Sequence, residues 1–296
     1  MKKCLKSAIV IISCLIASTS IFKIKAYETY NSFSNCKSNI LSMGAYDRNY
    51  DTNDDAVVNV FDAIRFNQSE LSSNDYAKPY SDLKGVAFGC SLTARGIENS
   101  AEYPAGEYFG YLRELQKVSG ILFENKGIGG YCFYNPTADS IYKRIISYDN
   151  YTDMDIVVIE GDFNGWNTEK ALGTYKDVKA DTTCGCMYNA IKFIKSKNPN
   201  IKIFVILDHF GKKMNDKWNG TSTEIRNGLT QQEYYSELKK VCEANNVECI
   251  ALYEMSNINE FNPEYISDFI HLNAWGEIYA GRLIYSKMIE MLQSKL

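Results

Sequence analysis

Apolar runs alternate with amphipathic segments along the chain from Leu83 onward. The short apolar runs are typical of strands buried on both faces, and the segments between them carry apolar residues at helical spacing. Strands are expected at 86–89, 121–124, 156–159, 203–207 and 249–252. Helices are expected at about 106–118, 139–148, 186–197, 230–245 and 274–294. This alternation predicts right-handed β-α-β units and therefore a three-layer α/β/α sandwich around a parallel sheet.

The chain before residue 84 has a different texture. Residues 27–83 are rich in Asn, Ser, Asp and Tyr and contain only short apolar stretches. Residues 1–26 combine a lysine-rich start with an apolar run too short for an ordinary membrane span, as in a secretory signal peptide. Lipidation at Cys14 is a weaker alternative, because apolar sequence continues beyond it. We expect a secreted protein with a small polar N-terminal region and a large domain at 84–296.

Removal of the signal peptide would leave an acidic chain. The sequence carries 32 basic and 36 acidic residues, and five lysines precede residue 27, so the mature chain has 27 basic groups and a formal charge of −9. Such a chain offers no broad positive surface to nucleic acid or to anionic membranes. We therefore expect neither as a partner of the mature protein.

Seven of the nine cysteines lie beyond residue 26, an odd number for an exported chain. Cys242 and Cys249 flank a turn-like segment and are a candidate disulfide pair, with buried thiols as the alternative. Cys184 and Cys186 lack a second ligand pair at zinc spacing, and the chain has only two histidines. A structural zinc site is therefore not expected.

Polar residues follow four of the expected strands, where open parallel sheets bind their ligands. Ser91 follows the first strand, after Gly89, and the glycine-containing loop 125–130 follows the second. Asn164 follows the third strand and His209 the fourth. Each also has an ordinary reading, as a helix cap, a turn residue or a buried structural histidine.

The sharpest chemical signal lies near the C-terminus, in Asp268-Phe269-Ile270-His271 just before a long helix. A serine nucleophile needs a base to take its proton and a carboxylate to orient that base. Aspartate three residues before histidine can supply both from one loop. Since the chain has only two histidines, Ser–His chemistry must use His209 or His271.

In their order along the chain, these segments resemble the sequence blocks of the SGNH (GDSL-like) hydrolase family. The matching segments, which span about residues 84–296, are Gly89-Cys90-Ser91-Leu92-Thr93, Asn125 to Gly130, Gly161-x-x-Asn164 and Asp268-x-x-His271-x-Asn273. The resemblance implies the flavodoxin-like sandwich of that family and points to its carbohydrate-esterase-like branch.

The resemblance also implies residue roles. Ser91 would be the nucleophile, His271 the general base and Asp268 its orienting carboxylate. The oxyanion would be bound by the backbone N–H groups of Ser91 and Gly130 and by the side chain of Asn164. No cofactor is implied for catalysis.

The chain departs from the family pattern at two positions. Cys90 stands where Asp usually precedes the nucleophile, and Gly165 stands where Asp usually follows the oxyanion Asn. The usual Asp at the first position is normally structural, so activity is expected to survive. A catalytically inactive descendant is the alternative.

An acidic segment in the N-terminal region resembles an EF-hand calcium loop. Its oxygen-bearing residues fall at loop positions 1, 3, 5, 9 and 12; they are Asp51, Asn53, Asp55, Asn59 and Asp62. Aspartate at position 12 resembles the loops of dockerins, which would imply a cohesin or scaffoldin partner and a cellulosome location. The match is degenerate, because Ala56 replaces the usual Gly and no second loop is present. A structural calcium clip and an acidic surface turn are the alternatives.

Together these patterns favour a secreted serine esterase that deacetylates a polysaccharide. The residues of the triad indicate ester hydrolysis, whereas the carbohydrate substrate depends on secretion, the dockerin-like loop and the resemblance. One alternative is a lipid or lysophospholipid esterase. Another is a non-catalytic glycan-binding or calcium-dependent assembly module.

Overall fold

The computed structural model describes residues 79–95, 110–215 and 219–293. They belong to one compact unit, Ala77–Leu296. The expected signal peptide, most of the polar N-terminal region and the calcium ligands expected between Asp51 and Asp62 lie outside the described residues.

The centre of the fold is a parallel sheet of five strands in the order β2-β1-β3-β4-β7. The strands are β1 (Lys84–Phe88), β2 (Leu122–Asn125), β3 (Ile156–Glu160), β4 (Lys202–Leu207) and β7 (Glu248–Ala251). All five expected strands are present, displaced by only one or two residues at their ends. From β1 the chain moves outward to β2 and then returns to β3 on the other side of β1. Open parallel sheets bind their ligands beyond the carboxyl ends of the strands at such a reversal, which here lies between β1 and β3.

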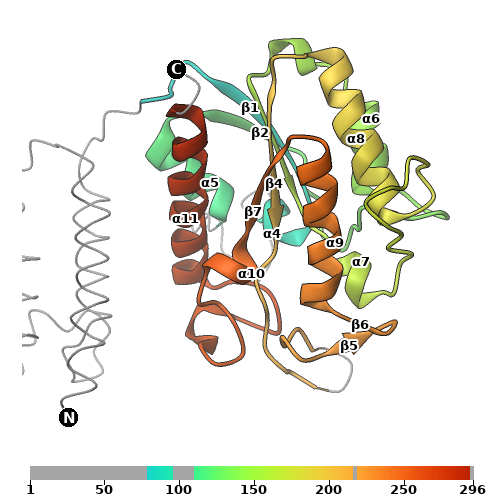
Figure 1. Ribbon diagram of the computed structural model, residues 1–296. Helices are drawn as coiled ribbons and strands as arrows, with labels where there is room; N and C mark the ends of the chain where they lie inside the picture. Colours follow the sequence, from blue (N-terminus) through green and yellow to red (C-terminus); the bar gives the residue numbers. More distant parts are fainter. Residues whose placement is uncertain (1–78, 96–109, 216–218, 294–296) are drawn as a thin grey trace, which may run out of the picture. The chain divides into compact units, whose positions relative to one another are not determined.

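Helices cover both faces of the sheet (Figure 1). One face packs against α6 (Ile141–Ser147), α8 (Thr183–Lys197) and α9 (Gln231–Ala244), and the other against α5 (Tyr111–Ser119) and α11 (Ala274–Gln293). The three-layer α/β/α sandwich predicted from the sequence is therefore confirmed. All five residues of β3 are buried, as expected for a central strand covered on both faces.

The contact between α5 and α11 holds the long C-terminal helix at Gly281 and Arg282. A Cβ atom at Gly281 would lie 2.7 Å from the carbonyl oxygen of Tyr111, so only glycine permits this approach. One residue later, Arg282 Nε lies 2.7 Å from Glu114 Oε1. The loop before α11, which carries Asp268 and His271, is therefore attached to a firmly packed helix.

Several short elements were not predicted from the sequence. They are α4 (Ser91–Ala94), η2 (Tyr151–Asp153), α7 (Phe163–Asn167), β5 (Ile225–Arg226), β6 (Leu229–Thr230), α10 (Leu252–Met255) and η3 (Pro263–Tyr265). Two of them, α4 and α7, carry Ser91 and Asn164. The α8 helix begins three residues earlier than expected, because the side chain of Thr182 caps it by accepting a hydrogen bond from Gly185 N.

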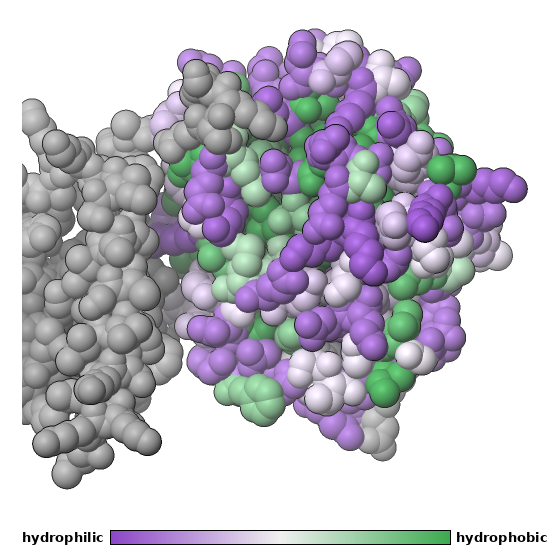
Figure 2. All heavy atoms as spheres, in the orientation of Figure 1, coloured by the Kyte–Doolittle hydropathy of each residue, from purple (hydrophilic) through white to green (hydrophobic). Residues whose placement is uncertain are grey.

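The face in Figure 2 is largely hydrophilic, with hydrophobic residues in separate patches. Among the described residues, none of the helices has the length and apolar character required to cross a bilayer.

Candidate active site

Strand β1 carries Ser91 to the rim of the sheet. Ser91 is the first residue of α4, and the turn before it is tight. A Cβ atom at Gly89 would lie 2.2 Å from Thr93 Oγ1 and 2.4 Å from Glu160 Oε2. The glycine therefore allows the side chains of Thr93 and Glu160 to fill the space beneath the nucleophile turn.

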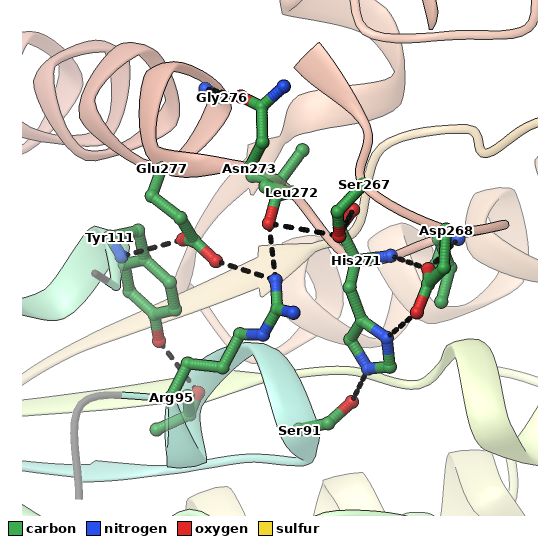
Figure 3. A network of polar contacts seen from close by, with 12 residues as sticks. Ser91, Arg95, Tyr111, Ser267, Asp268, His271, Leu272, Asn273, Gly276 and Glu277 are labelled. Carbon is green, nitrogen blue, oxygen red and sulfur yellow. Dashed lines mark hydrogen bonds and ion pairs between the residues drawn. The ribbon is translucent and has the colours of Figure 1, made fainter. Parts of the chain in front are cut away.

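Three side chains expected to act together form a continuous chain of hydrogen bonds (Figure 3). His271 Nε2 lies 2.7 Å from Ser91 Oγ, and His271 Nδ1 lies 2.6 Å from Asp268 Oδ2. The other carboxylate oxygen of Asp268 accepts hydrogen bonds from the backbone N–H of Ile270 and of His271. The three side chains thus have the spacing that a nucleophile, its base and an orienting carboxylate require.

The environment of Asp268 keeps its carboxylate ionised. Burial by itself raises the pKa of Asp268, but hydrogen bonds and the charge of His271 outweigh it and hold the pKa well below its usual range. The side chain is 34 % exposed, and that of His271 is 24 % exposed. The triad is therefore open to solvent on one side, where an ester could approach.

The second histidine has a different setting. His209 is fully buried, and its Nδ1 lies 2.7 Å from the carbonyl oxygen of Phe210. Burial lowers the pKa of His209 to about 4, so the ring is neutral near pH 7. Only His271 contacts Ser91, and His209 has the character of a buried structural histidine.

The loop that carries His271 is fixed at both ends. Ser267 donates its backbone N–H and its hydroxyl to the carbonyl oxygen of His271. Asn273 accepts hydrogen bonds from Trp275 N and Gly276 N at the start of α11. Asn273 therefore acts as an N-cap residue, which gives the last block of the resemblance a physical role.

The two further residues expected to bind an oxyanion are Gly130, in the loop after β2, and Asn164, in the first turn of α7. Gly130 has a φ of 78°, a conformation that favours glycine. The next residue, Tyr131, accepts a hydrogen bond of 2.9 Å from the side-chain amide of Asn164. That amide has a second N–H, so the contact leaves Asn164 one donor for a ligand.

Asp162 links the segment that follows Gly130 to helix α7. It is 1 % exposed, and one of its oxygens accepts hydrogen bonds of 3.0 Å from both Phe133 N and Gly165 N. The other accepts from the Tyr234 hydroxyl. Burial raises the pKa of Asp162 to about 6 despite these hydrogen bonds.

Three functional neighbours were not predicted from the sequence. Arg95 contacts the loop of His271, and Glu160 and Asp208 lie buried behind Ser91. Glu160 and Asp208 each stand at the carboxyl end of a strand. The sequence did contain a signal for these two residues, because each is an acidic residue at the end of an apolar strand. Burial of a carboxyl group is costly without a partner, so such a residue indicates a buried polar contact.

The cysteines in the described ranges are free thiols, Cys242 and Cys249 included. Within those ranges, one group of side chains has metal-ligand spacing, formed by Cys90, Glu160 and Asp208. Cys184 and Cys186 do not belong to this group.

Comparisons with known proteins place the fold. No protein-family model and no curated protein matches the chain. Solved structures do match. A protein from Lactobacillus plantarum is 20 % identical with a TM-score of 0.58, covering 72 % of this chain and 98 % of its own. A "possible lipase" from Chitinophaga pinensis is 17 % identical with a TM-score of 0.56, covering 71 % and 98 %. Another chain reaches 24 % identity and a TM-score of 0.63, covering 72 % and 98 %. The described domain therefore shares its three-layer fold with these proteins.

Proposed function

We propose that the chain is a serine ester hydrolase of the SGNH family. The observation that carries this proposal is the hydrogen-bonded series Ser91–His271–Asp268 at the rim of the sheet. It joins residues that are 180 positions apart in the sequence. The histidine lies between the serine and the aspartate, which is the arrangement that acyl transfer requires. The similarity to a "possible lipase" supports the same reaction class.

In the first half of the reaction, His271 Nε2 takes the proton from Ser91 Oγ as this oxygen forms a bond to the ester carbonyl carbon. Asp268 stabilises the imidazolium that results and holds Nδ1–H in the correct tautomer. The tetrahedral intermediate collapses when the bond to the leaving alkoxide breaks and His271 gives its proton to that oxygen. The products are an alcohol and an acyl group on Ser91.

In the second half, water replaces the serine as the nucleophile. His271 takes a proton from the water, which attacks the acyl carbon, and returns a proton to Ser91 Oγ as the acyl bond breaks. In both halves negative charge develops on the carbonyl oxygen. We assign its stabilisation to the N–H groups of Ser91 and Gly130 and to the side-chain amide of Asn164.

For the substrate we propose an acetylated polysaccharide. Trp275 lies in the first turn of α11, four residues after His271, and is 38 % exposed; Phe261 is 80 % exposed. Exposed aromatic faces of this kind pack well against the apolar faces of sugar rings. A lipid ester is the second candidate, favoured by the similarity to a "possible lipase".

Location and calcium binding complete the proposal. Residues 1–26 would direct export, and Asp51, Asn53, Asp55, Asn59 and Asp62 would bind calcium in the N-terminal region, either as a structural clip or for docking to a cohesin. Calorimetric titration of the signal-free chain with Ca²⁺ tests the loop, beside the variant Asp51→Ala/Asp55→Ala. Equal heats for both proteins would reject a calcium site there.

The catalytic proposal is tested with chromogenic acetyl, butyryl and octanoyl esters, beside Ser91→Ala. We expect turnover that falls as the acyl chain lengthens and disappears in the variant. Release of acetate from acetylated xylan, with deacetylated xylan as the control, then tests the polysaccharide. A preference for octanoyl esters would favour the lipid substrate. Equal rates for wild type and Ser91→Ala would reject the serine mechanism.

A further inference from the structure

Two buried carboxyl groups lie directly behind the nucleophile. Glu160 ends β3 and Asp208 immediately follows β4; they are 1 % and 0 % exposed. One oxygen from each and the sulfur of Cys90 all lie within 4.8 Å of one another. Burial of two negative charges at this separation would be very costly, so the arrangement calls for a neutralising partner.

Glu160 is surrounded by hydrogen-bond donors. Oε2 accepts from Cys90 N at 2.8 Å, Thr93 N at 3.2 Å and Thr93 Oγ1 at 2.7 Å. Oε1 lies 2.9 Å from Cys90 Sγ. Burial, followed by the negative charge of Glu160, raises the pKa of the Cys90 thiol well above its usual value, so the thiol stays protonated and donates. Glu160 is therefore the acceptor in four contacts.

Asp208 has the opposite character. Its Oδ2 accepts from Phe163 N at 3.2 Å and from the Tyr235 hydroxyl at 3.1 Å. Its Oδ1 is buried and receives no hydrogen bond from an N–H or hydroxyl group of the described residues. A carboxyl oxygen of Glu160 lies within 4.8 Å of a carboxyl oxygen of Asp208. Two carboxyl groups can share a hydrogen bond only if one of them carries a proton.

We propose that Asp208 is a protonated carboxylic acid that donates its hydrogen to Glu160. We further propose that this acid–carboxylate pair positions Ser91 relative to α7, which carries Asn164. Glu160 binds the backbone N–H groups on both sides of Ser91, those of Cys90 and Thr93. Asp208 binds the N–H of Phe163, the neighbour of Asn164. The shared proton is therefore the link between the turn of Ser91 and α7, the helix that carries Asn164.

The surrounding charges support this assignment. Burial, and then the charge of Glu160, raise the pKa of Asp208 well above its usual range. Five titratable groups interact electrostatically with one or both carboxyl groups: Cys90, Tyr111, Asp162, Tyr235 and Glu277. None of these five carries a positive charge near pH 7, so they do not neutralise the pair.

A divalent cation held by Cys90, Glu160 and Asp208 is the competing explanation. Such an ion would require a thiolate from Cys90, whereas burial favours the thiol. The backbone and hydroxyl donors around Glu160 also already occupy Oε2. A proton accounts for every contact in the cluster without displacing any of them.

Infrared spectroscopy of the whole protein tests the proton directly, independently of any activity. At pH 8.5, above the pKa of Asp162 at about 6 and of Glu277 at about 7, we expect a carbonyl band of a protonated acid. It should shift when the protein is labelled with ¹³C-carboxyl aspartate and vanish in Asp208→Asn. Absence of the band, or a divalent metal bound in stoichiometric amount by mass spectrometry, would overturn the assignment.

Three variants test the positioning role, which depends on the proposed esterase function. Asparagine can donate through Nδ2 to Glu160 and accept through Oδ1, as the protonated acid does. We therefore expect Asp208→Asn to restore most of the kcat that Asp208→Ala loses. In Glu160→Gln, the side-chain NH2 group would face the N–H, hydroxyl and thiol donors that surround the native carboxyl group. We therefore expect kcat to fall by about 10²-fold with little change in KM.

The expected order of kcat is therefore wild type, Asp208→Asn and then the other two variants. Equal losses in Asp208→Asn and Asp208→Ala, with both proteins folded, would contradict the positioning role. If no variant or wild type hydrolyses esters, the proposed function fails, while the infrared band still decides the proton.

Discussion

Arg95 donates a hydrogen bond from its guanidinium to the carbonyl oxygen of Leu272. Arg95 lies four residues after Ser91, at the end of α4, and Leu272 directly follows His271. The contact therefore connects the segment that carries Ser91 to the loop that carries His271 (Figure 3). Glu277 Oε1 lies 3.5 Å from the same guanidinium nitrogen and its Oε2 accepts from Tyr111 N. The Ser91–His271 distance thus depends on a buried ion pair outside the triad.

Replacement of Arg95 should therefore impair catalysis without removing a catalytic group. In Arg95→Lys the ammonium cannot reproduce the planar guanidinium contacts to Leu272 and Glu277. We expect kcat to fall by about 10- to 10²-fold, with KM changed much less. The matched control is Arg282→Lys, which alters another arginine–glutamate pair of α11, to Glu114. A loss of kcat equal in the two variants would contradict a specific role for Arg95.

Asn164→Ala tests the oxyanion assignment. The variant removes the donor expected at the developing negative charge and the hydrogen bond to Tyr131. We expect a loss of about 10²–10³-fold in kcat, measured by steady-state hydrolysis of an acetyl ester. Asn189→Ala, which removes an amide bonded only to backbone carbonyls of the α8 region, should retain wild-type kcat. Near-normal turnover in Asn164→Ala would remove this residue from the oxyanion hole.

Gly165 is explained by its neighbour. A Cβ atom there would lie 1.9 Å from Asp162 Oδ2, so the aspartate that the SGNH resemblance leads one to expect at 165 cannot coexist with Asp162 in this arrangement. Gly165→Asp should destabilise the fold by about 1–3 kcal/mol, and Gly165→Ala by a part of that. Chemical denaturation of both variants measures the effect. An unchanged free energy of unfolding in Gly165→Asp would show that the loop readily rearranges.

Glu277 predicts a pH dependence of stability. Burial raises its pKa to about 7 from an ordinary 4.5, although Arg95 opposes the shift. The folded state therefore binds this proton more tightly than the unfolded state. The stabilisation is complete below pH 4.5 and is lost as the pH rises towards 7, on the order of 3 kcal/mol in total.

The measurement is the free energy of unfolding of wild type and Glu277→Gln from pH 4.5 to 8. The wild type should lose stability relative to the variant as the pH rises through this window, and the difference should level off above it. A constant difference would mean that Glu277 is ionised throughout. Asp268 does not interfere, because its low pKa places its own effect at more acid pH.

The sequence was sufficient for the framework of the fold because hydrophobic periodicity reports burial directly. Each expected strand is present; Ser91 and Asn164 follow β1 and β3, and His271 lies in the loop before α11. Helix α7 was missed because Phe-Asn-Gly-Trp-Asn has the composition of a turn. It becomes helical because the buried side chain of Asp162 caps it by accepting from Gly165 N.

The polar contacts behind the triad could not be predicted for a different reason. Glu160 and Asp208 are separated by α7, α8 and β4, and Arg95 and Leu272 are 177 positions apart. Local sequence patterns predict that a residue lies at the end of a strand. They do not predict which distant side chain will contact it. These pairings depend on strand order and on the packing of α11 against α5.

The most direct test of the account is reaction of the folded protein with a fluorophosphonate, followed by intact mass and peptide mapping. The account predicts one adduct per chain on Ser91, absent from Ser91→Ala and formed much more slowly by His271→Ala. An adduct on another residue, or equal labelling of wild type and Ser91→Ala, would contradict the claim that Ser91 is the activated nucleophile of an esterase.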